Sequence, residues 1–422
     1  MSESSTDILS EQRDFAVHVV SRLRDAGYEA LWAGGCVRDL LLNRIPGDYD
    51  IATSAHPETV RQVFGKRRTL AIGASFGVIV VLPEKKSAGQ IEVATFRSDG
   101  QYIDGRRPDS VIFSSAEEDA QRRDFTVNGM FYDPIDERVI DYVGGEQDLS
   151  KRVVRAIGDP VARMTEDKLR MLRAVRFTST LGFELETETA NAIRGMADQL
   201  PAVSAERIAQ ELRKMLTGPD PARAIQLADD VELLKAFLPE LLPGEPLDRT
   251  LDMLRTLNDP SFGLAMAALL HSLGAKLAQK VCRRLKLSNS DTDTVVWIVE
   301  RTGSLDGAAS QSLAQLKRLF AHDVARQLLE FVRVHRIAYG APNDDVDFCN
   351  AFLRETPVEE INPPMLLTGD DLIRMGVKPG KQFKVWIDTV RDAQLNGDLA
   401  TREQAEEFAR TLIVDEEFGQ PG

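Results

Sequence analysis

The sequence has little of what marks a membrane, metal-thiolate or disulfide-linked protein. Its three cysteines, Cys36, Cys282 and Cys349, lie far apart with no C-x-x-C spacing, so neither a zinc site nor a disulfide framework is indicated. The chain contains no uninterrupted run of about 18 apolar residues, as a membrane helix needs. The polar N-terminus, MSESSTDILSEQRD, is not typical of a signal peptide. We therefore expect a cytoplasmic protein.

An excess of positive charge is also missing. The 422 residues hold 52 Lys and Arg against 66 Asp and Glu, a formal net charge of −14, which argues against a uniformly basic surface for a polyanion. The imbalance is uneven: residues 343–422 hold 8 basic and 17 acidic side chains, whereas residues 151–215 hold 12 and 9. A nucleic acid would therefore meet local basic patches, and its binding would weaken with added salt.

With 43% hydrophobic and 28% charged residues, the chain is typical of a globular protein with several domains. Alternating apolar patterns predict short strands, and a 3.6-residue period predicts helices. The N-terminal region has both kinds of segment, with strands at 30–33, 49–52, 69–72, 76–82 and 90–96, and helices at 11–26 and 57–64. Beyond residue 160 the pattern is helical, with the clearest helices at 161–181, 187–199, 205–216, 221–228 and 264–285.

This order predicts an α+β fold, in which a small, mainly antiparallel mixed sheet comes first and only helices follow. We divide the chain into a mixed region at 1–155 and helical regions at 156–218, 219–340 and 341–422. Gly218-Pro219 and Asn362-Pro363-Pro364 are typical of breaks between helical segments.

The most informative segment reads LWAGGCVRDLLLNRIPGDYDIAT and carries a glycine pair followed by two carboxylates. Asp48 and Asp50 are two residues apart, so in a strand they share one face. A pair of hard oxygen ligands is typical of Mg²⁺, which fills its other positions with water and substrate phosphate. A solvated strand start would also carry two such carboxylates.

A phosphate site is expected beside the carboxylates. Backbone N–H groups at Gly34 and Gly35, with the N-terminus of the following helix, can cradle phosphate oxygens, and Arg38 lies on that helix. An ordinary turn explains the glycines alone. The glycine pair, the basic helix and the carboxylate pair in this order indicate nucleotidyl transfer.

The segment resembles the signature of the class II tRNA nucleotidyltransferase and bacterial poly(A) polymerase family, a branch of the DNA polymerase β-like superfamily. The resemblance implies that residues 1–155 form the catalytic nucleotidyltransferase head and 156–218 a neck that recognises the base. It implies a body at 219–340 and a tail at 341–422 that contacts RNA. It also implies Mg²⁺ as cofactor, held by Asp48 and Asp50.

Further family motifs follow. Glu92 stands in IEVATF, where the family carries its third catalytic carboxylate, although an edge-strand glutamate would look the same. Arg123 and Asp124, in RRDFTVN, match nucleotide-binding residues: a guanidinium suits phosphate and a carboxylate can accept ribose hydroxyls. A surface ion pair is the plainer alternative. Gly100, Gly105 and Pro108 predict a surface loop, which in the family helps to change nucleotide specificity.

The segment MTEDKLRMLRAVRF carries a charged residue at every third position, namely Asp167, Arg170, Arg173 and Arg176. On a single helix each step of three turns by about 300°, so Asp167 and Arg170 are neighbours while Arg176 faces away from Asp167. An adjacent acceptor and forked donor can read the Watson-Crick edge of a base.

The resemblance supports this interpretation. Glu166, Asp167 and Arg170 match the family's E-D-x-x-R motif, which selects C or A, and Arg173 and Arg176 align with family nucleotide-binding arginines. A helix N-terminus capped by Thr165 would also carry acids here. Downstream, we expect an ion-paired structural face on the helix that holds Arg207.

These features predict a template-independent RNA nucleotidyltransferase that adds CCA to tRNA 3′ ends from CTP and ATP and releases pyrophosphate. The alternatives are a bacterial poly(A) polymerase, an enzyme that adds only CC or only A, and an RNA-binding scaffold with an inactive head. GASFGVIVV at residues 73–81 departs from the basic and aromatic pattern of poly(A) polymerases and favours CCA addition. No obligate protein partner and no membrane contact are expected.

Overall fold

The computed structural model describes residues 3–73, 77–99, 111–241 and 244–418. The chain forms two compact units, Met1–Glu240 and Leu241–Gly422. The first holds the whole expected head and neck together with the beginning of the expected body. The finer division into four regions stays a prediction. The expected loop at Gly100, Gly105 and Pro108 lies outside the described residues.

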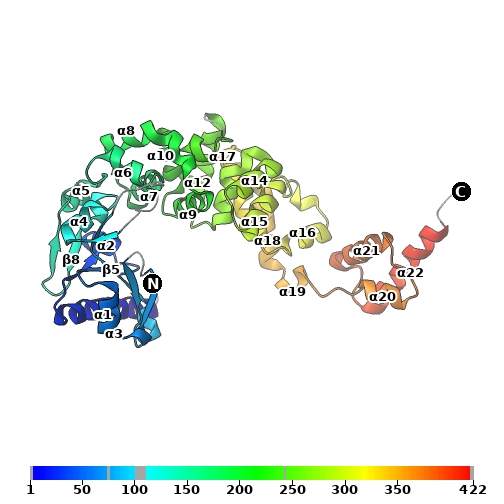
Figure 1. Cartoon of the computed structure of the whole chain (residues 1–422). Helices are drawn as coiled ribbons and strands as arrows, with labels where there is room; N and C mark the ends of the chain where they lie inside the picture. Colours follow the sequence, from blue (N-terminus) through cyan, green and yellow to red (C-terminus); the bar gives the residue numbers. More distant parts are fainter. Residues whose placement is uncertain (1–2, 74–76, 100–110, 242–243, 419–422) are drawn as a thin grey trace. The chain divides into compact units, whose positions relative to one another are not determined.

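A seven-stranded mixed sheet forms the centre of the first unit (Figure 1). Its strands, in spatial order, are β3 (Thr69–Gly73), β4 (Val78–Val81), β5 (Ile91–Thr95), β2 (Asp50–Thr53), β1 (Ala30–Ala33), β8 (Phe131–Asp133) and β9 (Arg138–Ile140). The β2 and β5 pair is parallel, and the other pairs are antiparallel. The mainly antiparallel sheet is confirmed, but β8 and β9 were not predicted because three residues are too few to show an alternating pattern.

Helices cover both faces of this sheet. Helices α1 (Glu3–Asp25) and α3 (Pro57–Phe64) pack on one side (Figure 1). On the other side, α4 (Ala116–Gln121) contributes Ala116 and Ala120 to a core with Leu31, Ala33 and Phe131. Because both faces are covered, all four residues of β1 are buried.

The remaining helices of the first unit lie close to the sheet or pack on one another. They are α2 (Gly35–Leu41), α5 (Gly145–Lys151), α6 (Pro160–Glu166), α7 (Leu169–Leu181), α8 (Thr187–Met196), α9 (Ala205–Leu216), α10 (Pro221–Asp230) and α11 (Leu234–Phe237). Helix α7 is largely buried and packs against both α9 and α10. Residues 156–218 therefore place one central helix, α7, next to residues 1–155, and α9 and α10 support it. We keep head and neck as names for these two predicted regions.

Three expectations about the helical region are wrong in detail. The single helix expected at 264–285 is two helices, Phe262–Leu270 and Gly274–Arg284, with a 3-10 turn at His271–Leu273 between them. The single helix expected at 161–181 is two helices, α6 and α7, because Asp167 has an extended backbone (φ −145°, ψ 105°). A strand also occurs after residue 160: β11 (Glu184–Leu185) pairs in parallel with β10 (Val153–Val154). A second small sheet joins β6 (Arg97–Asp99) and β7 (Val111–Phe113).

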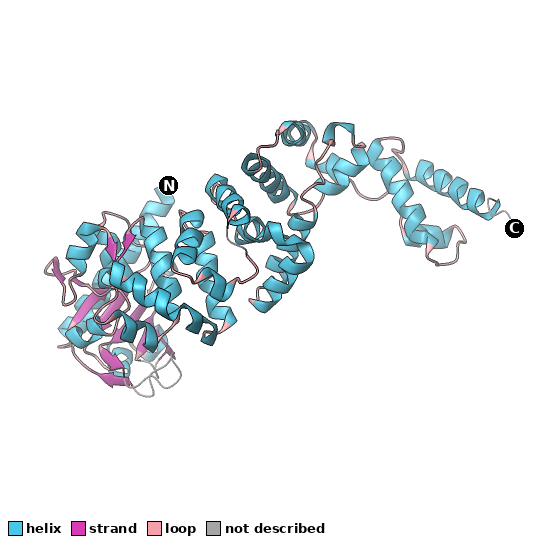
Figure 2. Ribbon diagram, turned by 90° about the horizontal axis from the view of Figure 1, so that it is seen from above, coloured by secondary structure: helices cyan, strands magenta, loops and turns pink. Residues whose placement is uncertain are grey.

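The described part of the second unit consists of helices and loops, and Figure 2 shows strands only in the first unit. Its helices are α12 (Glu245–Thr256), α13 (Phe262–Leu270), α14 (Gly274–Arg284), α15 (Asn289–Glu300), α16 (Leu313–Phe320), α17 (Ala325–Ala338), α18 (Asp344–Glu355), α19 (Val358–Ile361), α20 (Gly369–Arg374), α21 (Gln382–Asn396) and α22 (Arg402–Phe418). Every residue of α13 is buried, and α12, α15 and α17 pack around it. The α+β fold class is confirmed.

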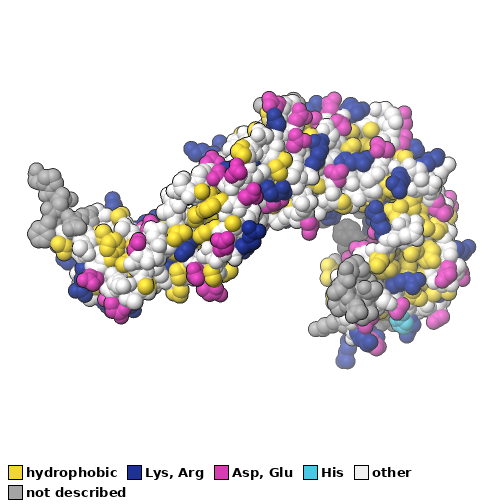
Figure 3. Space-filling view, turned by 180° about the vertical axis from the view of Figure 1, so that it is seen from behind, with side chains coloured by type: hydrophobic (Ala, Val, Ile, Leu, Met, Phe, Trp, Pro, Cys, Tyr) yellow, Lys and Arg dark blue, Asp and Glu magenta, His cyan; other side chains and the backbone are white. Residues whose placement is uncertain are grey.

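A second apolar cluster holds the C-terminal helices together. Leu367, Leu372, Val390, Ala405 and Ala409 form its buried centre. On the face drawn in Figure 3, basic and acidic side chains are interspersed over the surface, in keeping with the mixed charge of the sequence. Among the described residues, no helix combines the length and apolar character that crossing a bilayer requires.

The tight junction between α5 and the segment before β8 gives a first prediction. A Cβ added at Gly145 would lie 2.3 Å from the carbonyl oxygen of Thr126 and 2.6 Å from Cγ of Met130. We expect Gly145→Ala to lower the free energy of unfolding by about 1–3 kcal/mol through overpacking. Chemical denaturation of the full chain measures this change.

Gly195 is the matched control, because it lies inside α8 and an added Cβ would meet nothing within 4 Å. Gly195→Ala should stabilise the first unit by about 0.5–1 kcal/mol through helix propensity. Equal effects of the two substitutions would contradict the close contact at Gly145.

Candidate active site

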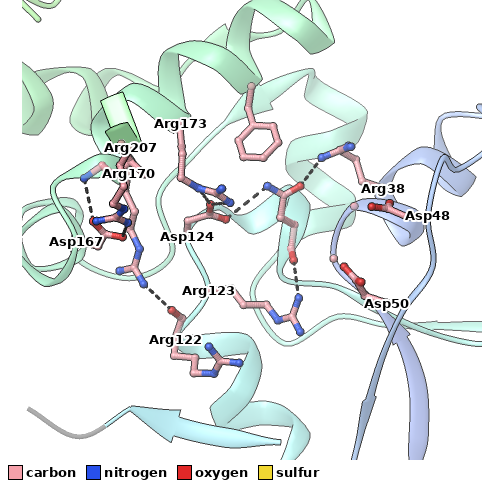
Figure 4. Close-up of a pocket in the computed structure, with 15 residues that line it drawn as sticks. Arg38, Asp48, Asp50, Arg122, Arg123, Asp124, Asp167, Arg170, Arg173 and Arg207 are labelled. Carbon is pink, nitrogen blue, oxygen red and sulfur yellow. Dashed lines mark hydrogen bonds and ion pairs between the residues drawn. The ribbon is translucent and has the colours of Figure 1, made fainter. Parts of the chain in front are cut away.

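A cavity of about 470 Å³ lies in the first unit between elements of the head and the neck. Its wall is mostly charged, and it collects side chains from α2, the start of β2, the segment after α4, and helices α7 and α9 (Figure 4). The lining residues are Gly34, Gly35, Arg38, Asp48, Asp50, Arg122, Arg123, Asp124, Asn128, Asp167, Leu169, Arg170, Arg173, Phe177 and Arg207. Ten of the twelve candidate residues from the sequence are in this set; Glu92 and Arg176 are not.

The two carboxylates expected to bind metal share one end of the cavity (Figure 4). Asp50 is the first residue of β2, whereas Asp48 precedes the strand, so the expectation that both lie in a strand is wrong for Asp48. The alternation nevertheless extends beyond the strand: Asp48 and Asp50 are exposed, while Tyr49 and Ile51 are buried. The two carboxylates therefore face the cavity together.

Glu92 lies beside Asp50 across the parallel pairing of β2 and β5. Residues paired in this register point to the same face of a sheet, so Glu92 and Asp50 share a face. The Asp50 side chain is open to the cavity, but the surrounding protein replaces much of the bulk water around it. This desolvation, followed by the negative charges of Asp48 and Glu92, raises the pKa of Asp50 to about 6, against the opposing effect of Arg123. The three carboxylates thus repel one another's charges.

These residues fit a divalent cation. Two accessible carboxylates at a cavity end are a typical protein contribution to a cation that also takes phosphate oxygens, and a cation would relieve the repulsion that raises the pKa of Asp50. Within the described ranges, however, no three His, Cys, Asp or Glu side chains gather closely enough to hold a metal ion. Phosphate and water would have to supply the remaining ligands.

The glycine turn differs from expectation in one respect. Gly34 precedes α2 with φ 76° and ψ −128°, a conformation that favours glycine, and a Cβ there would lie 3.1 Å from Nη1 of Arg123. Its N–H, however, donates to the carbonyl oxygen of Met130 at 3.3 Å. The Gly34 N–H is therefore already paired, and the expectation that it cradles phosphate is not supported.

Arginines from the head line the cavity next to the carboxylates. Arg38 donates to Asn128 Oδ1 at 2.6 Å and pairs with its neighbour Asp39. Arg123 donates to both Asp119 and the carbonyl oxygen of Asn128. Each guanidinium is therefore held at a fixed place near the carboxylates, on the wall of the cavity.

Asp124 joins the head to the neck. It is 8% exposed, and its Oδ2 accepts from Nε of Arg173 on α7 at 2.7 Å. Burial opposes ionisation of Asp124, but the charges of Arg173 and Arg170 and the Phe125 N–H outweigh it and lower the pKa of Asp124. The predicted pairing of this carboxylate with ribose hydroxyls would therefore have to coexist with a strong internal ion pair.

The break between α6 and α7 changes the geometry expected for the base-reading pair. Asp167 lies in the break, where its Oδ1 accepts from the N–H of Leu169 at 3.0 Å. Thr165 lies within α6 and is not an N-cap. Asp167 is paired not with Arg170 but with Arg207 of α9, at 2.6 and 3.2 Å.

Arg170 is 9% exposed and has other partners. It pairs with Glu166 and donates to the carbonyl oxygens of Arg163 at 3.0 Å and Arg122 at 3.1 Å. Asp167 and Arg170 still lie close together at the end of the cavity opposite Asp48 and Asp50 (Figure 4). The cavity therefore has a carboxylate end and, opposite it, an end formed by Asp167 and Arg170. We call the second the base-reading end, after the role that the sequence predicts for these two residues.

Arg176 lies outside the cavity lining. Its Nε donates to the buried Glu211 of α9 at 2.6 Å, and its guanidinium lies 4.0 Å from the ring centroid of Phe177. This places Arg176 as a support between α7 and α9, which differs from the nucleotide-binding role that the resemblance implies. The helical spacing predicted only that Arg176 faces away from Asp167. The face of α9 is ion-paired as expected, but to other helices, because Glu211 and Arg207 bind partners on α7 and in the break before it.

Five lining residues were not among the candidate site residues from the sequence: Arg122, Asn128, Leu169, Phe177 and Arg207. Asn128 ends the RRDFTVN motif, and Phe177 follows Arg173 at helical spacing, so local patterns could have drawn attention to both. Arg207 could not have been found in this way, because its partner Asp167 lies forty residues earlier. Only the packing of α9 against α7 brings them together.

Comparisons with known proteins agree with this geometry. Residues 30–155 match the family described as "Poly A polymerase head domain", and residues 182–244 match "Probable RNA and SrmB- binding site of polymerase A". A CCA-adding enzyme of Geobacillus stearothermophilus is 36% identical over 92% of this chain and 94% of its own length. One from Bacillus subtilis (strain 168) is 35% identical over 94% and 97%.

Solved structures agree as well. The Bacillus stearothermophilus CCA-adding enzyme in complex with CTP superposes with a TM-score of 0.78 at 32% identity, covering 96% of this chain and 98% of that one. A CCA-adding enzyme in complex with ATP gives a TM-score of 0.70 at 20% identity over 96% and 98%, which supports the fold. The chain belongs to the CCA-adding enzyme family, whose members are nucleotidyltransferases.

The buried ion pair between head and neck gives a pH-dependent prediction. The pKa of Asp124 is lowered in the folded state from an ordinary value of 3.8, so its contribution to stability is fully present above that value and is lost as the pH falls towards the folded pKa. At pH 7 we expect Asp124→Asn to cost about 2–3 kcal/mol, because it leaves Arg173 without its partner. The difference from the unsubstituted protein should stay constant down to pH 3.8 and shrink as the pH falls further.

Urea unfolding across this pH range measures the difference. Glu84→Gln is the control, because Glu84 and Arg68 form an exposed pair that should contribute little at any pH. A cost of Asp124→Asn that did not change with pH would show that the ionised pair is not its source.

Proposed function

We propose that this chain adds the nucleotides C, C and A to tRNA 3′ ends, taking them from CTP and ATP. The proposal rests on one observation: the same cavity has two carboxylates at one end and the Asp167 and Arg170 side chains at the other. A nucleotide placed between them would present its triphosphate to the carboxylate end and its base to the neck. The relatives' names, and solved family structures with CTP, ATP and tRNA, support the same substrates.

The residues at different places along the cavity would have different roles. Asp48 and Asp50 would hold Mg²⁺, whose chemistry there is to neutralise charge on the entering and leaving oxygens. Arg38 and Arg123 would bind the triphosphate, and Asp124 would accept a ribose hydroxyl. A Cβ at Gly35 would lie 3.6 Å from Nη2 of Arg38, so the glycine would leave room for the phosphates at the start of α2.

In the proposed reaction the 3′ oxygen of the RNA attacks the α-phosphorus of the bound nucleotide. A new P–O bond forms, the bond from the α-phosphorus to the bridging oxygen breaks, and pyrophosphate leaves. Glu92, on the same face as Asp50, would accept the hydroxyl proton. Arg123 would stay paired with the phosphates of the bound nucleotide as they leave as pyrophosphate, so its contact would be much the same before and during the reaction.

Base choice would rest on the neck. Asp167 offers acceptor oxygens and Arg170 forked donors, the groups needed at a Watson-Crick edge. Because Asp167 is bound by Arg207 and Arg170 by Glu166, an entering base would have to exchange these contacts for its own. Arg173 would fix the position of α7 relative to the head through its ion pair with Asp124.

Nucleotide incorporation tests the function directly. Purified protein with Mg²⁺ and a tRNA that lacks its 3′ end is given labelled CTP alone, ATP alone, or both. We expect two C residues from CTP alone and a terminal A only when the CC end is present. Long A tails on unrelated RNA would instead indicate a poly(A) polymerase, and addition of only CC or only A would indicate a partial enzyme.

Asp48→Asn tests the carboxylate assignment. Loss of a cation ligand removes several kcal/mol of charge stabilisation, so the incorporation rate should fall by about 10³-fold while thermal stability is retained. Asp136→Asn, at an exposed head carboxylate outside the cavity, should keep full activity. Retained activity in Asp48→Asn would refute the assignment.

Asp167→Asn tests base reading. Replacing one acceptor oxygen with a donor changes the pattern offered to the base, so the preference for C and A over U and G should weaken by about 10–100-fold. Arg207→Met should act in the same direction, because it frees Asp167 to move. Asp198→Asn on the neck surface is the control, and unchanged discrimination in Asp167→Asn would contradict base reading there.

A further inference from the structure

One buried carboxylate of the head has no place in the roles assigned so far. Asp119, on α4, is 1% exposed and does not line the cavity. Its sequence neighbours, Arg122 and Arg123, follow at three and four residues, the spacing that puts side chains on one helix face. Both arginines do line the cavity.

The two oxygens of Asp119 are divided between these arginines. Oδ1 accepts from Nε and Nη2 of Arg122 at 2.9 and 2.7 Å, and Oδ2 accepts from Nε and Nη2 of Arg123 at 3.2 and 3.0 Å. The N–H of Arg97, which begins β6, also donates to Oδ1 at 3.3 Å. A single carboxylate thus fixes two guanidinium groups and the start of a strand.

These bonds determine what each arginine presents to the cavity. Arg123 uses three guanidinium N–H groups on Asp119 and on the Asn128 carbonyl, which leaves two of its five for a ligand. Its guanidinium also lies 5.1 Å from the ring centroid of Phe131. Its charge reaches Asp50, where it opposes the rise in pKa.

Arg122 extends the network towards the base-reading end. Its carbonyl oxygen accepts from Nη2 of Arg170 at 3.1 Å, while its side chain donates to the Arg97 carbonyl at 3.0 Å. Burial opposes ionisation of Asp119, but Arg123 and Arg122 outweigh it and lower its pKa. Asp119 therefore carries its negative charge while it organises both arginines.

We infer that Asp119 is a positioning residue for the triphosphate, which acts by holding the Arg123 guanidinium in the orientation that meets the phosphates. The inference rests on the proposed function and adds a residue to it. Preorganising a charged donor spares the nucleotide the cost of ordering that side chain. Because Arg123 contacts phosphate in both the ground state and the transition state, its misplacement should appear mainly in KM.

Asp119→Asn is the test variant, since it keeps the shape and removes the charge. We expect KM for CTP and for ATP to rise about tenfold each, the consequence of one weakened charge-assisted contact, with kcat changed less than about threefold. The inhibition constant of cytidine, which has no phosphates, should stay unchanged. A merely structural role would alter cytidine and CTP binding alike.

A double-mutant cycle identifies the route of the effect. In an Arg123→Gln background, Asp119→Asn should add less than about a twofold change in KM, because the group through which it acts is gone. A full additional tenfold change would overturn the inference. Unchanged KM values in Asp119→Asn, or equal losses for CTP and cytidine, would overturn it as well.

Asp133→Asn is the matched control. Asp133 is fully buried, pairs with Arg24 and lies outside the cavity lining, so its loss should lower stability without raising KM. If Asp119→Asn does not fold, Asp119→Glu is the test variant instead. Its longer side chain should displace the Arg123 guanidinium and raise KM about threefold. An inactive unsubstituted protein would refute the proposed function itself, whereas active protein with unaltered variants would refute only the role of Asp119.

Discussion

The ion pair between Asp124 and Arg173 is the contact on which the cavity depends. It joins the segment after α4 in the head to the central helix α7 of the neck, and it lies between the carboxylate end and the base-reading end. The Asp124 carboxylate is withdrawn from water, whereas the Arg173 side chain is 33% exposed. A buried carboxylate is tolerable because a partner of opposite charge satisfies it. The packing of α7 against α9 and α10 fixes the backbone of Arg173, so that its side chain can contact the head.

Internal ion pairs of the same kind occur around the wall of the cavity. Asp119 holds Arg122 and Arg123, Glu166 holds Arg170, Arg207 holds Asp167, and Glu211 holds Arg176. Most groups expected to bind a nucleotide therefore already have partners. The net binding free energy of a nucleotide would be the difference between the contacts that it makes and the internal contacts that it replaces. Such an exchange favours selectivity over affinity. Asp48 and Asp50 differ, since their repulsion is relieved only by a cation or a proton.

Much of this could be predicted from local sequence. The glycine pair, the alternation around Asp48 and Asp50, and the position of Glu92 in an apolar strand are patterns within a few residues, and the observed β2 and β5 register agrees with them. Errors arose where a residue's partner is distant. The helix expected at 161–181 breaks at Asp167, which binds the distant Arg207 and the N–H of Leu169 two residues away. The bond to Leu169 is of a local kind that Asp favours, but the local sequence does not predict the bond to Arg207.

The sequence by itself determined the order of the fold, from mixed head to helical remainder, and the chemical identity of the groups available for phosphate, metal and base, because spacing along a chain fixes which side chains share a face. Tertiary structure alone decided the ion pairs between residues that are distant in the sequence. Arg207 reached Asp167, and Arg173 reached Asp124, through helix packing that depends on the whole first unit. The choice of a distant partner is set by distance and burial in three dimensions, and neither quantity can be predicted from a short stretch of residues.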